Sequence, residues 1–213
     1  MSGSTSRIRR GRPSDVENLV DLHYRVFDEH THQTVLFGPG FLRAAYRWYT
    51  ESADAFTLIA DVNGHVEGSC AVNRGSYYVV FRRNLPALAR AMLGNPRVLL
   101  NKALWKRLAA VRAKRRPESG EPAYLAYLTV SPIGREARCG KALIEAAIAE
   151  CRRRGWDEIR GAIHRENVPA RFMYKILGFE ERAELNHGSL IGIRLRTSAC
   201  AAVSPPGPAS TRT

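Results

Sequence analysis

The sequence predicts a single α/β domain with a mixed sheet flanked by helices, because strand and helix patterns alternate along the chain. With 213 residues and a hydrophobic content of 45%, the chain is long and apolar enough to bury a core without disulfides or metal ions. The expected elements follow the order βααββ, a helical insertion, and βαβαββ. This order favours helices that pack on one shared sheet.

The first expected elements are a short strand and two helices. Residues 7–10 form the strand, and Ser14 or Asp15 can cap the first helix. Gly38-Pro39-Gly40 interrupts the chain before the second helix. The apolar positions that keep the helical period are Val16, Leu19, Val20, His23, Val26 and Phe27 in the first helix, and Phe41, Leu42, Ala45, Trp48 and Tyr49 in the second.

Residues 56–62 and 66–73 form the clearest hairpin of the sequence, since Asn63-Gly64 between them suits a tight turn. A basic insertion follows at about 77–116, with a helical pattern from about Asn84 and a break at Gly94-Asn95-Pro96. Beyond the break the pattern is amphipathic, with an apolar face made of Leu100, Leu104, Leu108 and Val111.

The second half of the chain alternates strands and helices. The expected segments are strand 124–130, a helix from about Gly140 to Arg154, strand 158–163, helix 168–177, and strands 180–185 and 189–196 around Asn186-His187-Gly188. We expect the domain to span residues 7–197, with a flexible N-terminus at 1–6 and a disordered tail at 198–213, whose composition cannot bury a core.

The net charge of +13 is concentrated in one part of the chain, because no acidic residue occurs between Glu67 and Glu118. Such a patch favours an anionic partner: a nucleotide-linked substrate, a membrane surface reached by segment 82–116, or nucleic acid. The alternative is a solvated helix face that aids solubility. Nucleic acid is disfavoured as a partner, since the sequence lacks a basic aromatic platform and a DNA-reading helix motif.

The four cysteines are far apart and form no CxxC pair, so free thiols are expected rather than a zinc site or a disulfide framework. The histidines form no metal-binding motif, and no metal site is expected. No apolar run approaches the roughly 20 residues that span a bilayer. Residues 1–10 are polar and basic, unlike a signal peptide. These features favour a cytoplasmic protein.

Two segments carry the chemistry, and the first is a candidate anion site. Strand 124–130 leads through Ser131-Pro132 into a basic stretch and then into the start of a helix. Free backbone N–H groups and the helix dipole attract anions at such a place. The stretch consists of Arg135, Glu136, Ala137, Arg138, Cys139, Gly140, Lys141 and Ala142. An ordinary surface loop rich in arginine would have a similar composition.

The second segment runs from Asn167 to Phe179. Asn167 can cap a helix that Gly178 ends, and Ala170 and Tyr174 share one face of this helix. A capped helix that packs aromatic residues would explain each feature separately. The full pattern, N-x-x-A-x-x-x-Y-x-x-x-G-F, is much rarer than its parts.

Together the two segments resemble the signature motifs of the GNAT acyltransferase superfamily, in their usual order and at their usual separation. The first motif is normally written R/Q-x-x-G-x-G/A, and the second is the complete pattern above. The likeness is sharp over residues 124–179 and consistent in element order over 7–73. It implies a GNAT-like, mixed, mostly antiparallel sheet flanked by helices, with the basic helical insertion between strands 3 and 4.

The resemblance also implies that acetyl-coenzyme A is the acyl donor. Backbone groups of Leu128 and Val130 would pair with its pantetheine arm, and residues 135–142 would hold its pyrophosphate. Asn167 would contact the coenzyme. Tyr174 would act as the general acid that protonates the leaving thiolate when an amine attacks the thioester directly.

Arg138 departs from the family pattern, because it stands where the first motif has its first glycine, while Gly140 fills the last position. Glycine there permits a positive φ or a close approach of phosphate. An arginine would crowd the loop, although its guanidinium can itself bind phosphate. We interpret the segment as a variant coenzyme site.

The general base is the weakest part of the pattern. Many relatives place a carboxylate on the strand at 124–130, where this chain has Tyr124 and Ala126. His30 or His32, between the first two helices, can deprotonate an amine near neutral pH. A water chain is the alternative.

The leading hypothesis is therefore an N-acetyltransferase that acts on the amine of a small molecule. The insertion resembles that of GNAT members associated with bacterial surface-sugar biosynthesis, which suggests a nucleotide- or lipid-linked amino sugar as acceptor. The alternatives are a protein or peptide N-acetyltransferase, and a non-catalytic basic binding module for nucleic acid or membrane. A homodimer is compatible with the sequence, which fixes neither the acyl-chain length nor the oligomeric state.

Overall fold

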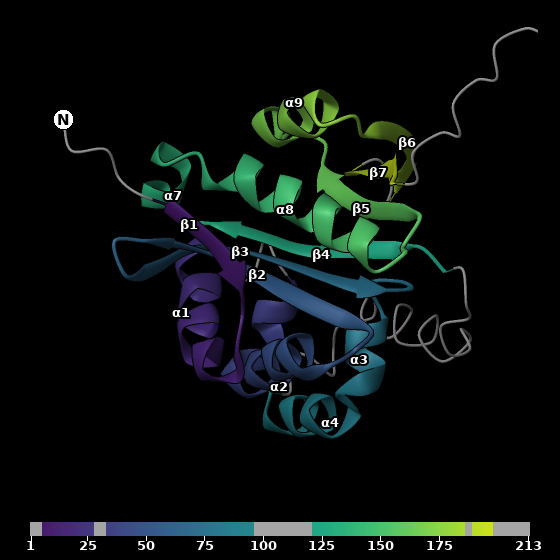
Figure 1. The fold of residues 1–213 in the computed structure, drawn as a ribbon. Helices are drawn as coiled ribbons and strands as arrows, with labels where there is room; N and C mark the ends of the chain where they lie inside the picture. Colours follow the sequence, from purple (N-terminus) through teal and green to yellow (C-terminus); the bar gives the residue numbers. More distant parts are fainter. Residues whose placement is uncertain (1–5, 28–32, 96–120, 186–188, 198–213) are drawn as a thin grey trace, which may run out of the picture.

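The computed structural model describes residues 6–27, 33–95, 121–185 and 189–197, which form one seven-stranded sheet covered by helices (Figure 1). The strand order is β1-β2-β3-β4-β5-β7-β6, and every neighbouring pair except β4–β5 is antiparallel. The strands are β1 (Ser6–Arg10), β2 (Ala55–Val62), β3 (His65–Arg74), β4 (Ala123–Val130), β5 (Glu158–His164), β6 (Glu180–Leu185) and β7 (Leu190–Arg196). The expected mixed, mostly antiparallel sheet is confirmed.

Helices cover both faces of this sheet (Figure 1). One face carries α1 (Val16–Val26), α2 (Gly38–Glu51), α3 (Val79–Arg83) and α4 (Leu85–Gly94), and the other carries α8 (Cys139–Arg153) and α9 (Val168–Ile176). The short helix α7 (Pro132–Glu136) connects β4 to α8. Within the described ranges, no helix is long and apolar enough to cross a membrane.

Each face of the sheet has its own core. Under α1–α4 the core contains the fully buried Tyr46 and Tyr49 of α2, together with Tyr127 of β4. Under α8 and α9 it contains Leu143 and Ile144 of α8. Burying one large aliphatic side chain contributes about 2 kcal/mol to stability, so the two cores hold the helices firmly on the sheet.

A β-bulge in β4 changes which residues face which core. The pairing with β3 runs Ala71↔Tyr127 and then Val72↔Leu125, so Ala126 is the extra residue. Before the bulge, Leu125 packs in the core under α8 and α9. After the bulge, Tyr127 packs in the core under α1–α4, and Leu128 packs against the core under α8 and α9. A bulge shifts the alternation of side chains by one residue, which explains this reversal.

The hairpin turn between β2 and β3 has the geometry that Asn63-Gly64 predicts. Both residues have a positive φ, 54° for Asn63 and 85° for Gly64, as in the turns that match the twist of a two-residue hairpin. The Gly64 N–H donates to a carboxylate oxygen of Asp61 at 2.8 Å.

The structure differs from the expected elements at several places. Asp15 precedes α1, but its side chain makes no cap hydrogen bond to this helix and instead pairs with Arg9 at 2.7 Å. Helical structure in the insertion begins at Val79 rather than near Asn84, which separates α3 from α4. The stretch after Ser131 contains α7, where a loop was expected, because Ser131 caps a turn that begins with Pro132. Residues 96–120, including the expected amphipathic face, lie outside the described residues.

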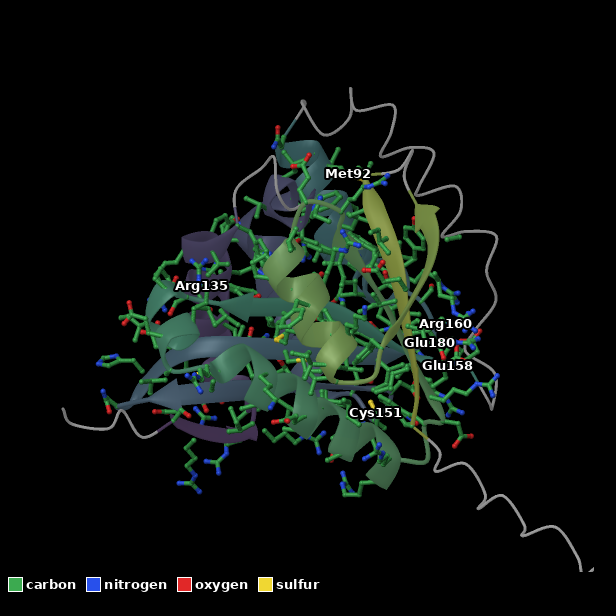
Figure 2. The ribbon with its side chains drawn as sticks, turned by 90° about the horizontal axis from the view of Figure 1, so that it is seen from above. Met92, Arg135, Cys151, Glu158, Arg160 and Glu180 are labelled. Atoms are coloured by element: carbon green, nitrogen blue, oxygen red, sulfur yellow. The ribbon has the colours of Figure 1, made fainter. Side chains whose placement is uncertain are left out.

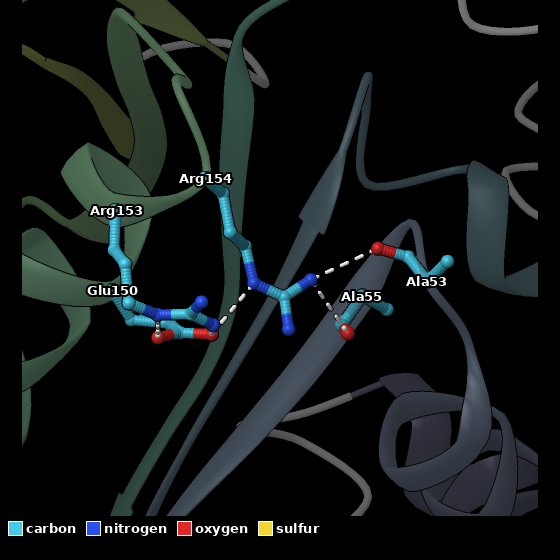
Figure 3. A network of polar contacts seen from close by, with 5 residues as sticks. All are labelled: Ala53, Ala55, Glu150, Arg153 and Arg154. Atoms are coloured by element: carbon cyan, nitrogen blue, oxygen red, sulfur yellow. Dashed lines mark hydrogen bonds and ion pairs between the residues drawn. The ribbon is translucent and has the colours of Figure 1, made fainter.

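The C-terminal end of α8 is fastened to β2 by an arginine network (Figure 3). Arg154 donates to Glu150 at 2.7 Å and to the carbonyl oxygens of Ala53 at 2.9 Å and Ala55 at 3.3 Å. Arg153 binds the same carboxylate through two hydrogen bonds of 2.7 Å. The Arg154 guanidinium also lies 4.8 Å from the centre of the Phe56 ring and 5.1 Å from that of Trp156, close enough for cation–π attraction.

The three described cysteines are Cys70, Cys139 and Cys151, and all are buried free thiols. Burial raises the pKa of Cys70 and Cys139, and raises the pKa of Cys151 to about 12. Burial favours the neutral thiol because the charged thiolate loses its hydration.

Glu150→Gln should destabilise the protein at neutral pH but not in strong acid. Hydrogen bonds from Arg153, and then from Arg154, lower the pKa of Glu150 from 4.5 to about 2. A carboxyl with a lower pKa in the folded state stabilises above its unfolded pKa, and the contribution disappears as the pH falls through the folded pKa. We expect a loss of about 1 kcal/mol at pH 7 after allowing for solvent screening, measured by urea unfolding.

The difference between wild type and Glu150→Gln should vanish as the pH approaches about 2. Glu17→Gln is the control, since Glu17 forms an exposed ion pair with Arg43, and it should change stability little at any pH. A Glu150→Gln deficit that does not depend on pH would contradict this account.

Candidate active site

The main feature of the site is an opening in the sheet between β4 and β5. Among the described residues these parallel strands pair only at Ala123↔Ile159 and Tyr124↔Arg160. On its other side β4 stays paired with β3 as far as Val130, and β5 stays paired with β7 as far as His164. The β5-facing edge of β4 from Leu125 onwards is therefore open to an extended ligand, which can pair with it as a strand would.

The mouth of the opening differs in charge pairing from the closed end, where β4 and β5 are still paired. Figure 2 shows Arg135 at one end of the molecule and Glu158, Arg160 and Glu180 at the other. At the closed end Arg160 pairs with Glu158 at 2.5 Å, and Arg194 lies 3.8 Å from Glu158 and from Glu180. These arginines are neutralised within the protein, whereas Arg135 is exposed at the mouth of the opening.

The turn after β4 is held tightly against β3. Ser131 N donates to the Glu67 carbonyl at 3.0 Å, and the Ser131 hydroxyl accepts from Gly134 N at 3.0 Å. A Cβ added to Gly134 would lie 2.3 Å from the Glu67 carbonyl oxygen, so only glycine fits there. The turn therefore positions α7 and the residues that follow it.

Arg138 has a positive φ, which is one of the two features that a glycine at this motif position would permit. It precedes α8 with φ 54° and ψ 27°, in the left-handed region, and is one of two described non-glycine residues with a positive φ. This conformation costs roughly 1–2 kcal/mol for a residue with a Cβ. The exposed Arg138 adds a cation at the start of α8.

Gly140 lies in the first turn of α8, between two hydrophobic neighbours. A Cβ at this position would be 3.7 Å from the Met173 sulfur and 3.7 Å from Val130, which are ordinary contacts. Glycine in a helix is less stable than alanine by about 1 kcal/mol. Since the protein itself has room for a methyl group here, a ligand that approaches the backbone is the better reason for a glycine.

The other residues expected to bind the coenzyme lie along the same path. Leu128 and Val130 are on the open part of β4 and pack partly against the α8 core. The predicted phosphate loop is divided between α7, which ends with Arg135 and Glu136, and α8, which begins at Cys139. In the stretch 135–142, Arg135, Glu136, Arg138 and Lys141 are exposed, Ala137, Gly140 and Ala142 are half-buried, and Cys139 is buried.

Helix α9 contributes the second predicted motif. Asn167 caps it, accepting a hydrogen bond from Ala170 N at 3.2 Å, and is exposed. Tyr174 is 4% exposed and packs edge-on against Phe179, with ring centres 5.1 Å apart. Burial, with a smaller effect from Cys70, raises the pKa of Tyr174 well above its usual value, so this phenol remains protonated and can donate a hydrogen bond.

A tyrosine cluster covers the opposite face of β4, and the sequence interpretation gave it no role. Tyr77 lies 6.0 Å from Tyr124 and 6.2 Å from Tyr127 between ring centres, and Tyr49 lies 5.8 Å from Tyr127. The Tyr49 hydroxyl donates to Asn73 at 3.1 Å. The alternation of β4 alone could not have found this cluster, because the bulge at Ala126 reverses it.

Among the residues that the structure describes, none is identified as a general base. His30 and His32 lie outside the described residues. Burial raises the pKa of Tyr124 to about 12 and that of Tyr127 well above its usual value, so both are neutral near pH 7 and poor bases. His23 is buried in the α1–α2 core, where its ring nitrogens contact the Tyr46 and Thr34 hydroxyls at 2.8 and 3.1 Å.

A mixed sheet that opens between two parallel strands, with a helix N-terminus at the mouth of the opening, defines the class of coenzyme A-dependent acyltransferases with this fold. The chain belongs to the acetyltransferase (GNAT) family, whose model matches residues 23–179. It is therefore an acyltransferase that uses acetyl-coenzyme A as its donor.

Solved structures agree with this family. The structure of SsHAT has a TM-score of 0.63 and 22% identity, and the match covers 92% of this chain and 100% of that chain. The PaiA N-acetyltransferase of Thermoplasma acidophilum, in complex with coenzyme A, has a TM-score of 0.58 and 15% identity, and the match covers 90% of this chain and 99% of that chain. The ribosomal-protein-S18-alanine N-acetyltransferase of Escherichia coli has a TM-score of 0.55 and 14% identity, and the match covers 94% of this chain and 99% of that chain. At these identities the likeness concerns the fold. A comparison with curated proteins found no match.

Two substitutions at Arg138 should separate backbone strain from charge. Arg138→Gly relieves the left-handed strain and Arg138→Ala keeps it, so the glycine variant should be the more stable by about 1 kcal/mol. Both variants lose the same cation and should weaken coenzyme A binding by a similar factor. Urea unfolding and calorimetry check the two effects. Equal stability of the variants would show that this backbone position is not strained.

Proposed function

We propose that this chain transfers the acetyl group of acetyl-coenzyme A to the amine of a small, anionic, sugar-like molecule. The observation that carries the proposal is the open edge of β4, which leads to the basic loop before α8. An extended arm fits the edge, and a diphosphate fits the loop. The room around Gly140 and the left-handed Arg138 support the same assignment.

The residues of the chain divide the work between binding and chemistry. Arg135, Arg138 and the N–H groups at the start of α8 bind the phosphates, while Leu128 and Val130 align the arm through their backbone groups. Acetyl-coenzyme A supplies an acyl group activated as a thioester. Tyr174 donates a hydrogen bond to the sulfur as it becomes a thiolate, which stabilises the charge that develops there. Asn167 caps α9 and so fixes the helix that carries Tyr174.

The removal of a proton from the attacking amine needs a separate group. We assign this step to His30 or His32, or to a chain of water molecules, because the phenols of Tyr124 and Tyr127 are too weakly acidic to exist as phenolates. An imidazole has the right pKa for the step near neutral pH.

The tyrosine cluster and the nearby charges favour a particular kind of acceptor. Tyr77 and Tyr124 are half-buried and present aromatic rings and hydroxyl groups, which suit stacking and hydrogen bonding to a sugar. Helices α3 and α4, which lie between Tyr77 and Tyr124 in the chain, carry Arg82, Arg83 and Arg90 and no acidic residue, and Arg83 pairs with Asp54 at 3.5 Å. A cationic acceptor such as a polyamine would find little attraction here, whereas a sugar that bears phosphate would. The same charges would favour contact with an anionic membrane surface.

The proposal is tested by measuring thiol release from acetyl-coenzyme A in the presence of amino sugars, nucleotide-linked amino sugars, polyamines, amino acids and peptides. We expect turnover with amino sugars and a preference for those linked to a diphosphate. Turnover with peptides alone would assign a protein amine as acceptor instead. Calorimetry should show coenzyme A binding that Arg135→Glu weakens, because a carboxylate replaces a cation at the mouth of the opening. A wild-type protein that binds no coenzyme A would overturn the proposal.

Tyr174→Phe should reduce turnover more than it reduces coenzyme affinity. The variant removes the hydrogen bond to the leaving sulfur but keeps the packing against Phe179, so kcat should fall on the order of a hundredfold while KM for acetyl-coenzyme A changes little. Steady-state kinetics measure both constants, and thermal unfolding verifies that the variant is folded. An unchanged kcat would remove the acid role of Tyr174.

A further inference from the structure

We infer that Glu67 is a positioning residue for the coenzyme, acting through Ser131 on the loop that binds phosphate. This inference rests on the proposed function, since it assumes that the residues after Ser131 hold the coenzyme. Glu67 belongs to β3, is 5% exposed, and contributes no atom to the path along β4 and α8 described above. Its carboxylate instead accepts a short hydrogen bond from the Ser131 hydroxyl.

The contacts of Glu67 join three elements at one point. Its backbone carbonyl accepts from Ser131 N, and its side chain accepts from the hydroxyl of the same residue. The Ser131 hydroxyl in turn accepts from Gly134 N at 3.0 Å, in the first turn of α7. Glu67 therefore orients the hydroxyl whose oxygen caps α7, because the O–H donates to the carboxylate and the oxygen lone pairs stay available to accept from Gly134 N.

Arg25 of α1 lies near the same carboxylate oxygen, Oε2, that accepts from the Ser131 hydroxyl. Its guanidinium lies 3.5 Å from the Glu67 carboxylate and donates to the Val66 carbonyl at 3.1 Å. Half of the Arg25 side chain is exposed, toward a groove of about 540 Å³ lined also by Asp21 and His65. The chain Arg25–Glu67–Ser131 thus connects α1, on one face of the sheet, with the loop before α8 on the other.

Simple electrostatics would place no carboxylate here. A negative charge under a loop that attracts phosphate weakens binding through Coulomb repulsion. The charge does reach the loop: burial is the main cause of the raised pKa of Cys139, the first residue of α8, and Glu67 adds to that rise. If repulsion dominates, removal of Glu67 should strengthen coenzyme A binding, whereas if positioning dominates it should weaken binding. The two effects can therefore be told apart by experiment.

The experiment measures the dissociation constant of coenzyme A by calorimetry for the wild-type chain and for Glu67→Ala, Glu67→Gln and Ser131→Ala. If Glu67 positions the loop, Glu67→Ala should bind about tenfold more weakly, although a negative charge has been lost. Glu67→Gln keeps an acceptor oxygen for Ser131 and should recover part of the affinity. Ser131→Ala should resemble Glu67→Ala, and the double variant should be no weaker than either, because both remove one shared hydrogen bond.

Two controls separate positioning from charge and from general loss of stability. Glu136→Gln removes an exposed carboxylate at the end of α7, within the predicted phosphate-binding stretch, and should tighten binding on the order of twofold. Asp15→Asn disrupts another buried carboxylate, which binds Arg9 near the β1 edge of the sheet, and should lower the unfolding temperature without changing the coenzyme affinity.

Tighter or unchanged binding by both Glu67 variants would overturn the inference and leave the proposed function intact. Weaker binding by Asp15→Asn in proportion to its loss of stability would also overturn it, since any destabilised variant would then behave alike. Failure of the wild-type chain to bind coenzyme A would overturn the proposed function itself, and is thus a distinct outcome.

Discussion

The site depends on one constraint: β4 is bound to β3 along its whole length but to β5 over two residue pairs only. Two parallel strands that separate leave backbone N–H and C=O groups on both edges without a strand partner. Such edges persist in a folded protein when water or a ligand satisfies them. The divergence turns the middle of the sheet, normally its most stable part, into a place where an extended molecule can bind.

The surrounding structure keeps this opening in place. At the closed end, Arg154 connects the last turn of α8 to the start of β2, and Glu150 fixes Arg154 (Figure 3). At the open end, Ser131 and Gly134 hold the turn after β4 against β3. Helix α8 is thus fixed at both ends, so that its N-terminus points into the mouth of the opening. Preorganised N–H groups lose little entropy when they bind an anion, which favours affinity.

Much of the fold could be predicted from local patterns. The Asn63-Gly64 turn, the glycine that ends α8 and the Asn167 cap of α9 each follow from the chemistry of one or two residues. The bulge at Ala126 could not be predicted, because it depends on the register between β3 and β4. The tyrosine cluster and the contacts of Glu67 could not be predicted either, since both bring together segments that are far apart in sequence. For Arg138 the motif glycine left two explanations open, a positive φ or a close approach of phosphate, and the structure shows the positive φ.

The burial of the three described cysteines has a practical side for the enzymology of this chain. Disulfide reagents react with thiolates, and a buried thiol with a raised pKa offers very little thiolate at the surface. A chromogenic reagent that reports the coenzyme's own sulfhydryl as it accumulates would therefore meet a slow background from Cys70, Cys139 and Cys151. An unfolding protein would expose them, so a late rise in colour would report loss of structure rather than turnover.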